Sequence, residues 1–482
     1  MVLPHEYMYH LCREWPAAFE RRARGPEESI IDWWQQARRF GWYAQHPARM
    51  FVEADPGKVI PVRIYGDDAQ YNKQRTLTVF TFSSILCKLP SQQSRFLVAL
   101  LPVAASTKET YDKFYDVVQW SFLWLLRGQW PDSDHLGNPW PPSSWRSTMA
   151  GRPLFENGFR FAVVQVLGDW KFLKEAFSLE FNYNTRACCH KCEAVKEGDG
   201  PPFDDFGPAA RHRQTRRTTQ QYLARFIVPP PLSRLPGFHL DMLACDPMHC
   251  VHLGVLQWII GSLLVVLAQS GHWGIFAGDA VTRLNLAMRV AFGEFVTWCK
   301  QRAVHTSQEP FTAAMLNRSE KQAVFPKFKC KAANGRWVGM WLNDVFVTRN
   351  VLGLEAAVIW GVCEMLHIMH EHHRAFLSRR EASRFVRGGT CMLRSYAALA
   401  LKAKGDGLAL WCIKPKHHLL SHLIDHVGSS CENPSVFWTF CDEDFNGRMA
   451  KMSGNLNAKQ FSLRAMERYV LGLYLGLKRE PA

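Results

Sequence analysis

A single acidic residue at the end of a long apolar run is the feature that most constrains the fold of this chain. The run at residues 161–168 (FAVVQVLG) is followed directly by Asp169. Such a run is typical of a buried strand, and the carboxylate is then expected at the strand's carboxyl end. Twenty residues later the chain reads Cys189-His-Lys-Cys192. This cysteine spacing is typical of half a zinc site, so the chain combines a strand-end carboxylate with a metal knuckle.

The overall composition favours a polyanionic partner. The chain has 482 residues, 47% of them hydrophobic, which is enough to build more than one core. Its 58 Lys and Arg residues against 43 Asp and Glu give a net charge of +15, which favours nucleic acid or an anionic membrane surface. The fourteen cysteines show no paired framework and the amino terminus does not resemble a signal peptide. We therefore expect reduced thiols in the cytosol or nucleus.

One apolar stretch, residues 253–268 (LGVLQWIIGSLLVVLA), could be taken for a membrane span. It falls short of the roughly 20 residues that a spanning helix needs, and Gln257 interrupts it. The stretch therefore predicts a buried core helix, and we expect no membrane partner.

The first half of the chain predicts three strands, a helix and a fourth strand. The strand patterns lie at residues 62–65, 77–82, 96–101 and 161–167. A capping box at Ser106-Thr-Lys-Glu109 marks the start of the helix, which ends at Gly128. This order is the front half of an RNase H-like fold. In that fold one carboxylate comes from the first strand, a second from the end of the fourth, and a third from a late helix.

The predicted fold class is α/β, an RNase H-like core interrupted by a large all-α insertion. Long apolar helices are expected within the insertion near residues 250–268, 280–300 and 351–371. The predicted divisions are a helical segment at 1–54, the first part of the core at 55–170, the insertion with its zinc knuckle at 171–430, and helices that complete the core at 431–482.

Asp67, Asp169 and Glu443 are the predicted catalytic acids. Carboxylate oxygens are the ligands that Mg²⁺ (or Mn²⁺) prefers, and two such ions can promote phosphodiester displacement. Asp67 follows the first strand pattern, and the third acid comes from Asp442-Glu443-Asp444, where Glu443 is the first choice. The alternative is that Asp67 sits in a polar turn and Asp169 only caps a helix.

The expected zinc ligands are Cys189 and Cys192 together with His249 and His252. The two histidines belong to the motif Asp246-Pro-Met-His249-Cys250-Val-His252, and Cys188 and Cys250 are substitute donors. Their spacing is shorter than in zinc fingers, so buried thiols that only pack are the alternative.

Three basic segments are candidate contacts to a nucleic-acid backbone, which would give affinity without sequence specificity. In the segment that begins at Lys414, the residues His418, His422 and His426 recur every four positions on one helical face, and a partly buried polar face is the alternative. The candidate contacts are Lys414, Lys416, His418, Lys327, Lys329, Lys331, Arg211, Arg213, Arg216 and Arg217.

Taken in order, six motifs resemble those of DDE transposases of the CACTA and Plavaka type. They are Ile64-Tyr-Gly-Asp67, Leu167-Gly-Asp169, Cys189-x-x-Cys192, Asp246-Pro-Met-His249-x-x-x-Leu-Gly254, Lys414-Pro-Lys-x-His418 and Glu443-Asp-Phe-Asn-Gly-Arg448. The resemblance covers roughly residues 55–470.

It implies a nuclear cut-and-paste DNA transposase core that takes Mg²⁺ and Zn²⁺. Asp67, Asp169 and Glu443 would be its acids, and Cys189, Cys192 and His249 the knuckle of its insertion. Water would attack the phosphodiester, and the freed 3′-hydroxyl would then attack target DNA. DNA is the expected partner, with a homo-oligomer as a further expectation.

Two other functions are compatible with the sequence. A non-catalytic nucleic-acid-binding protein could keep the same scaffold, and it would need only the basic surface. A helical scaffold protein could use the zinc site for stability alone, and it would need no basic groove across the carboxylates. Convergence of the three acids distinguishes the enzyme from both.

Overall fold

The computed structural model describes residues 1–318, 324–348, 353–454, 456 and 460–479. The chain is a mixed α/β protein that divides into two compact units. Unit 1 comprises Met1–Glu180, Arg217–Ala244 and Thr439–Ala482, and unit 2 comprises Phe181–Arg216 and Cys245–Trp438. The predicted boundaries at 170 and 430 lie near the unit boundaries at 180 and 438. The segment expected at 1–54 belongs to unit 1, as does Arg217–Ala244, which was expected in the insertion.

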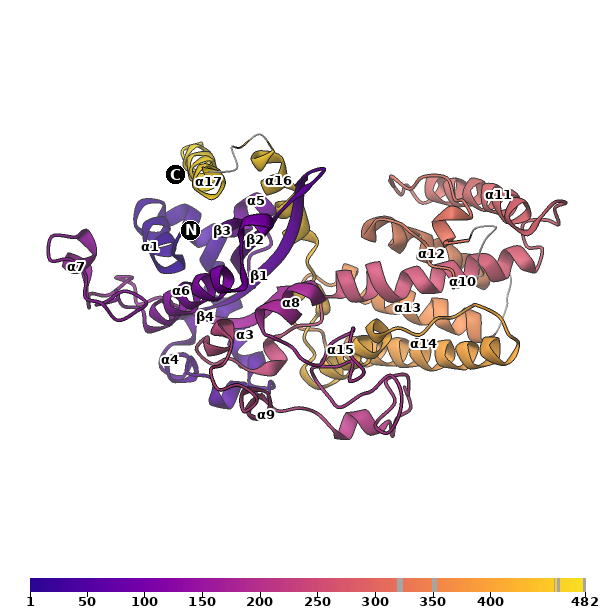
Figure 1. The fold of residues 1–482 in the computed structure, drawn as a ribbon, viewed down its shortest axis with the longest axis horizontal. Helices are drawn as coiled ribbons and strands as arrows, with labels where there is room; N and C mark the ends of the chain where they lie inside the picture. The colour runs from indigo at the N-terminus through magenta and orange to yellow at the C-terminus, as the bar shows by residue number, and fades with distance from the viewer. Residues whose placement is uncertain (319–323, 349–352, 455, 457–459, 480–482) are drawn as a thin grey trace. The chain divides into compact units, whose positions relative to one another are not determined.

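Unit 1 contains one four-stranded mixed sheet in the order β3-β2-β1-β4 (Figure 1). Strand β1 pairs antiparallel with β2 and parallel with β4, and β2 pairs antiparallel with β3. All four predicted strands are present, each longer than its sequence pattern. Their bounds are β1 Val59–Asn72, β2 Arg75–Ser84, β3 Phe96–Pro102 and β4 Arg160–Gly168.

The sequence predicted that β1 ends before Asp67, but the strand continues past this residue. Its pairing with β4 stops at Gly66 opposite Gly168, but its pairing with β2 continues through Asp67 opposite Val79 to the end of the strand. The polar residues after Asp67 are therefore the tip of a hairpin and not a loop. Asp67 lies within a strand, at the point where the parallel partner of that strand ends.

The helix between β3 and β4 is α6 (Lys108–Arg127), which packs against β4. It begins one residue later than the predicted capping box, because the hydroxyl of Thr107 accepts the hydrogen bond from the Thr110 amide. It ends at Gly128, whose φ of 68° is readily adopted only by glycine.

The carboxyl-terminal segment of the chain returns to the sheet. Helix α16 (Phe440–Ser453) contacts β1, and α17 (Phe461–Leu477) contacts β3. A late helix therefore completes unit 1, as expected. The other helices of unit 1 are α1 Pro4–Glu14, α2 Pro16–Phe19, α3 Glu27–Ala37, α4 Arg49–Ala54, α5 Ser91–Ser94, α7 Trp145–Met149, α8 Trp170–Ala176 and α9 Thr219–Leu223.

Unit 2 is helical in the part that the structure describes. Its elements are a π-helix at Met248–Val255, α10 Leu256–Gln269, α11 Ala280–Gln301, α12 Ala332–Thr348, α13 Leu354–Glu371, α14 Arg379–Gly405 and α15 Pro415–Ser430. Three of them confirm the long apolar helices predicted from the sequence. Residues 351–352 of the third prediction lie outside the described residues.

The continuous helix Met248–Gln269 contains the apolar stretch predicted at residues 253–268. Among the described residues it alone is long and apolar enough to cross a membrane, and 83% of its most apolar window is buried inside the structure. Its core-facing residues include Leu256, Ile260 and Leu264, which are fully buried.

We expect Gly168→Ala to destabilise unit 1 by about 1–3 kcal/mol, the usual range for overpacking a well-packed site. A methyl group on residue 168 would lie 2.4 Å from the Phe172 ring and 2.5 Å from the backbone oxygen of Gly66. The ring can shift but the strand backbone cannot. Denaturant unfolding measures the change, and Gly41→Ala is the control because a methyl group there meets no atom within 4 Å. Equal stability of the two variants would contradict the packing described here.

Candidate functional site

Two of the predicted acids lie where the parallel pairing of β1 with β4 ends. Gly66 of β1 pairs with Gly168 of β4. Asp67 and Asp169 are the residues that directly follow these two glycines in the sequence. The ring of Phe172 packs on both glycines, where any side chain would collide with it. Asp67 and Asp169 also line one cavity of about 450 Å³ in unit 1. Strand geometry therefore brings these two carboxylates to one edge of the sheet.

Asp169 has a structural role of its own. Its Oδ1 accepts a hydrogen bond of 2.7 Å from the Phe172 amide and so caps α8. This is the alternative that the sequence left open for Asp169. A cap uses one carboxylate oxygen, and the residue still lines the cavity with Asp67.

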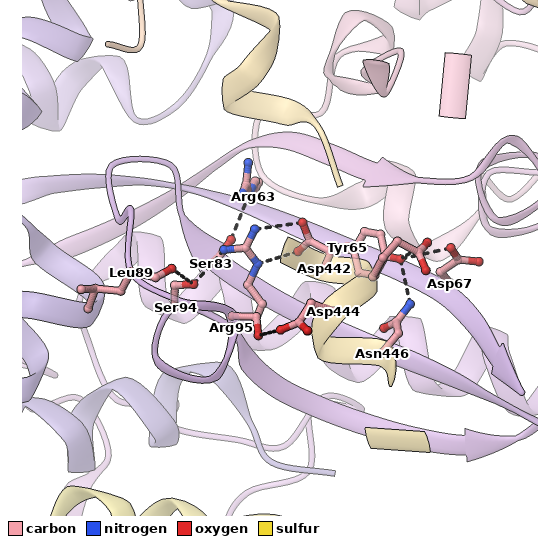
Figure 2. A network of polar contacts seen from close by, with 12 residues as sticks. Arg63, Tyr65, Asp67, Ser83, Leu89, Ser94, Arg95, Asp442, Asp444 and Asn446 are labelled. Atoms are coloured by element: carbon pink, nitrogen blue, oxygen red, sulfur yellow. Dashed lines mark hydrogen bonds and ion pairs between the residues drawn. The ribbon is translucent and has the colours of Figure 1, made fainter. Parts of the chain in front are cut away.

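Asp67 and Glu443 meet at the hydroxyl of Tyr65. The Tyr65 hydroxyl lies 3.1 Å from Asp67 Oδ2 and 3.2 Å from Glu443 Oε1, and it accepts a hydrogen bond of 2.8 Å from Asn446 Nδ2 (Figure 2). An oxygen of Asp67 lies within 4.8 Å of one of Glu443. Burial, and then the charges of the two carboxylates, raise the pKa of Tyr65 far above its ordinary value. The phenol therefore stays protonated, and the two carboxylates share its single hydrogen.

The three consecutive acids of α16 point to different partners. Asp442 is buried and accepts two hydrogen bonds from Arg95, of 2.7 and 2.9 Å (Figure 2). Asp444 accepts from Ser91 and from Arg448. Glu443 is thus the acid that reaches Asp67.

The Arg95–Asp442 pair is part of a buried polar network that anchors α16 to the sheet. Arg95 is 3% exposed and Asp442 is 1% exposed, so both charges are removed from water. Arg63 lies close by and donates a 3.0 Å hydrogen bond to Ser83 Oγ (Figure 2). Burial, and then the charge of Arg95, lower the pKa of Arg63 to about 10. Asp442 is therefore the counter-charge for a buried basic cluster, and this contact fixes the position of the neighbouring Glu443.

A second cluster lies in unit 2 and consists of Cys189, Cys192, His418 and His422, all buried. Cys189 Sγ is 3.4 Å from His422 Nε2, and Cys192 Sγ is 3.2 Å from His418 Nε2. The two Nε2 atoms are 3.1 Å apart. In a tetrahedral zinc site with ordinary bond lengths, neighbouring donor atoms are separated by about 3.4–3.6 Å. The four residues therefore form a Cys₂His₂ cluster that could bind a metal such as zinc.

The surroundings of this cluster prepare its donor atoms for a metal. His418 Nδ1 lies 3.0 Å from the backbone oxygen of Phe203, which fixes the tautomer that leaves Nε2 without a hydrogen. Burial alone would raise the pKa of the Cys189 thiol, but its hydrogen bond with Cys192 and the adjacent imidazoles lower that pKa well below its ordinary value. A thiolate is the form of cysteine that binds zinc.

The prediction of the second pair of zinc ligands needs correction. The histidines of the cluster come from α15 and not from the segment with His249 and His252. His249 Nδ1 lies 2.6 Å from Asp246 Oδ2, and the buried ring of His252 lies 5.7 Å from that of His370. His418 was expected at a phosphate backbone, and this assignment is wrong because the side chain is fully buried. The sequence signal for these ligands was the four-residue spacing of the histidines on α15. It places His418 and His422 on one helix face, where both can reach the two cysteines.

The other predicted backbone contacts lie at or near the surface. Arg213 and Arg216 both pair with Asp425 of α15. Arg211 is exposed, and Arg217 is half-buried in unit 1. The lysines are all in unit 2, where Lys329, Lys331 and Lys414 are exposed and Lys327 and Lys416 are half-buried.

No protein-family model matches the sequence, and no curated protein matches it. Function is therefore inferred from the geometry of the two clusters.

We expect Cys192→Ser to remove bound zinc and to lower the melting temperature of the protein, because a structural zinc contributes directly to folding. Elemental analysis of the purified protein and thermal unfolding measure the two effects. Cys188→Ser is the control, since Cys188 is also buried but lies outside the four-residue cluster. Zinc bound in equal amounts by the two variants would contradict the assignment of Cys192 as a ligand.

We expect Arg95→Met to destabilise the protein by about 3–5 kcal/mol, because it leaves the buried Asp442 carboxylate without its partner. The double variant Arg95→Met, Asp442→Leu should recover part of this loss, since it leaves no buried carboxylate and keeps Arg63 as the one buried charge of the cluster. Arg49→Ala breaks an exposed pair with Glu53 and should leave stability unchanged. Denaturant unfolding compares the three, and a double variant no more stable than Arg95→Met would contradict this explanation.

Proposed function

We propose that unit 1 is the catalytic core of a DDE-type DNA transposase, resembling the CACTA and Plavaka type, that cleaves and joins DNA strands by metal-dependent phosphoryl transfer. The observation that carries the proposal is the meeting of Asp67 and Glu443 at the Tyr65 hydroxyl, with Asp169 on the adjacent strand end. Two carboxylates held this close repel each other, and a bound cation relieves that repulsion.

The topology supports an RNase H-like core. Strands β1 to β3 form an antiparallel meander, and β4 pairs parallel to β1 after a crossover through α6. The second acid follows β4, and the third lies on a late helix beside β1. These are the positions at which an RNase H-like fold is expected to supply its acids.

The carboxylates suit Mg²⁺ or Mn²⁺ because they offer oxygen donors. Asp67 and Glu443 would hold the metal together, and Asp169 would contribute the oxygen that does not cap α8. When bound, a pair of such ions supplies activation of the attacking oxygen and stabilisation of the leaving oxygen. Tyr65 sets the distance between Asp67 and Glu443, and the Arg95–Asp442 pair holds the helix that presents Glu443.

Zinc in unit 2 would be structural under this proposal. Four protein donors close the coordination sphere and leave no position for water or substrate. The two cysteines come from Phe181–Arg216 and the two histidines from α15, so the metal would join two segments that are distant in sequence. DNA as the substrate and a location in the nucleus belong to the same proposal.

One observation favours a second function, a non-catalytic nucleic-acid-binding protein on the same scaffold. Asp169 caps α8 and does not join the group of donor atoms formed by Asp67 and Glu443. A protein that had lost strand cleavage would keep the cap for stability. The rival function therefore predicts DNA binding without cleavage.

We expect the purified protein to nick supercoiled plasmid DNA when Mg²⁺ or Mn²⁺ is added. The Asp169→Ala variant should nick the plasmid at least about a hundredfold more slowly than the parental protein. The reason is that each carboxylate lost weakens the hold on a cation. Gel electrophoresis of the plasmid measures nicking, and a mobility-shift assay without added Mg²⁺ measures binding. DNA binding by the parental protein with no metal-dependent nicking would favour the non-catalytic function.

Glu443→Gln and Asp444→Asn form a matched pair for the third acid. Glu443→Gln should lose nicking as Asp169→Ala does, and Asp444→Asn should keep it, because Asp444 faces Ser91 and Arg448. Loss of nicking in Asp444→Asn alone would overturn the assignment of Glu443.

A further inference from the structure

In unit 2 a short lysine-rich segment is fixed along helix α10. The Phe328 amide donates a 2.9 Å hydrogen bond to the backbone oxygen of Gln257, and Gln257 Nε2 donates one of 2.9 Å to the backbone oxygen of Cys330. Gly261 lets the segment approach, since a methyl group there would lie 2.7 Å from the backbone oxygen of Pro326. The backbone of residues 326–330 is thus held against the helix and cannot swing freely.

The burial of this segment alternates from one residue to the next. Pro326 and Phe328 are buried, while Lys329 and Lys331 are exposed and Lys327 is half-buried. In an extended chain, alternate side chains share one side and recur about every 6.6–7 Å. The three lysines therefore form a row of positive charges on the outer side of a fixed backbone.

Two more lysines and a tryptophan extend this row. The ammonium groups of Lys327 and Lys414 lie 5.8 and 5.6 Å from the centre of the Trp258 ring. Lys416, in the first turn of α15, donates a 2.7 Å hydrogen bond to the backbone oxygen of His249. Burial, and then the charge of Lys416, lower the pKa of Lys327. We call this set the lysine ridge: Lys327, Lys329, Lys331, Lys414 and Lys416 around Trp258.

The charges of the lysine ridge are not neutralised within the protein. Among the described residues, no salt bridge joins any of the five lysines to a carboxylate, whereas Arg213 and Arg216 of the same unit share Asp425. Two of the five ammonium groups, those of Lys327 and Lys414, lie by the Trp258 ring, and a cluster of like charges attracts a polyanion. The ridge therefore has the character of a binding surface for repeated negative charge.

We propose that the lysine ridge binds single-stranded nucleic acid, with phosphates at the lysines and a base against Trp258. A row of ammonium groups suits a chain of phosphates, and the half-buried Trp258 ring beside Lys327 and Lys414 is an aromatic surface against which an unpaired base can stack. In a duplex the bases are already stacked on each other, so the ring would add little there. This binding uses unit 2 alone and does not require the carboxylates of unit 1.

The test measures the affinity for a single-stranded oligonucleotide at several salt concentrations, without added Mg²⁺. For the triple variant Lys329→Gln, Lys331→Gln, Lys414→Gln, the slope of log affinity against log salt should become shallower by about 2, since each lost phosphate contact removes about 0.7. The matched control is Lys300→Gln, Lys402→Gln, Lys404→Gln, which removes the same charge from exposed positions of unit 2. Equal slopes in the two triple variants would overturn the proposal.

Trp258 supplies the second part of the test. Trp258→Ala should weaken binding of the single strand about tenfold and leave binding of a duplex unchanged. Trp360→Ala, which changes a tryptophan that is 39% exposed in the same unit, should alter neither. Circular dichroism and zinc content show whether each variant is folded. An equal loss for duplex and single strand would overturn the stacking role.

Two further outcomes separate this proposal from others. The triple variant Lys329→Gln, Lys331→Gln, Lys414→Gln is the ridge variant. If it binds oligonucleotides as the parental protein does but no longer binds vesicles that contain phosphatidylserine, the lysine ridge faces a membrane and the proposal fails. If the ridge variant binds normally and plasmid nicking persists, the ridge proposal fails while the catalytic one stands. Loss of nicking in Asp169→Ala with intact ridge binding leaves both standing.

Discussion

The buried ion pair between Arg95 and Asp442 is the contact on which the arrangement of unit 1 depends. It joins the start of β3 to a helix that is more than three hundred positions away in the sequence, and it does so where neither charge meets water. A buried pair of this kind adds little net stability compared with apolar residues, but it tolerates only one geometry. Because the next residue is Glu443, this geometry also decides which acid of α16 faces Asp67.

The Cys₂His₂ cluster joins distant segments of unit 2, as the Arg95–Asp442 ion pair joins distant segments of unit 1. Each joins segments that the chain order separates, and each is buried. They differ in what they require. The ion pair is complete within the protein, whereas four converging thiol and imidazole donors reach their full stabilising effect only with a metal. The stability of unit 2 is therefore expected to follow the metal supply, and that of unit 1 is not.

Local patterns were sufficient to predict much of the fold. Alternating β-branched and aromatic residues placed β2, a short strand pattern placed β1, and apolar runs placed β3 and β4. The capping signal placed α6 within one residue. The end of β1 was missed because the residues after Asp67 are polar, and only their pairing with β2 keeps them in a strand. Cys189 and Cys192 were found because their spacing is local. Their partner His418 lies 226 positions from Cys192, and its helical periodicity could not reveal what it faces.

The sequence could narrow the third acid to three consecutive residues and no further. On a helix, successive side chains point about 100° apart, so Asp442, Glu443 and Asp444 must face three different directions. Sequence cannot decide which direction faces the sheet, because that depends on how α16 is rotated about its axis. The buried charge of Arg95 sets that rotation by requiring Asp442 inward, and Tyr65 and Asn446 then secure Glu443 one residue further on. A structural ion pair and a candidate catalytic carboxylate are thus adjacent for a physical reason: the first fixes the rotation that gives the second its direction.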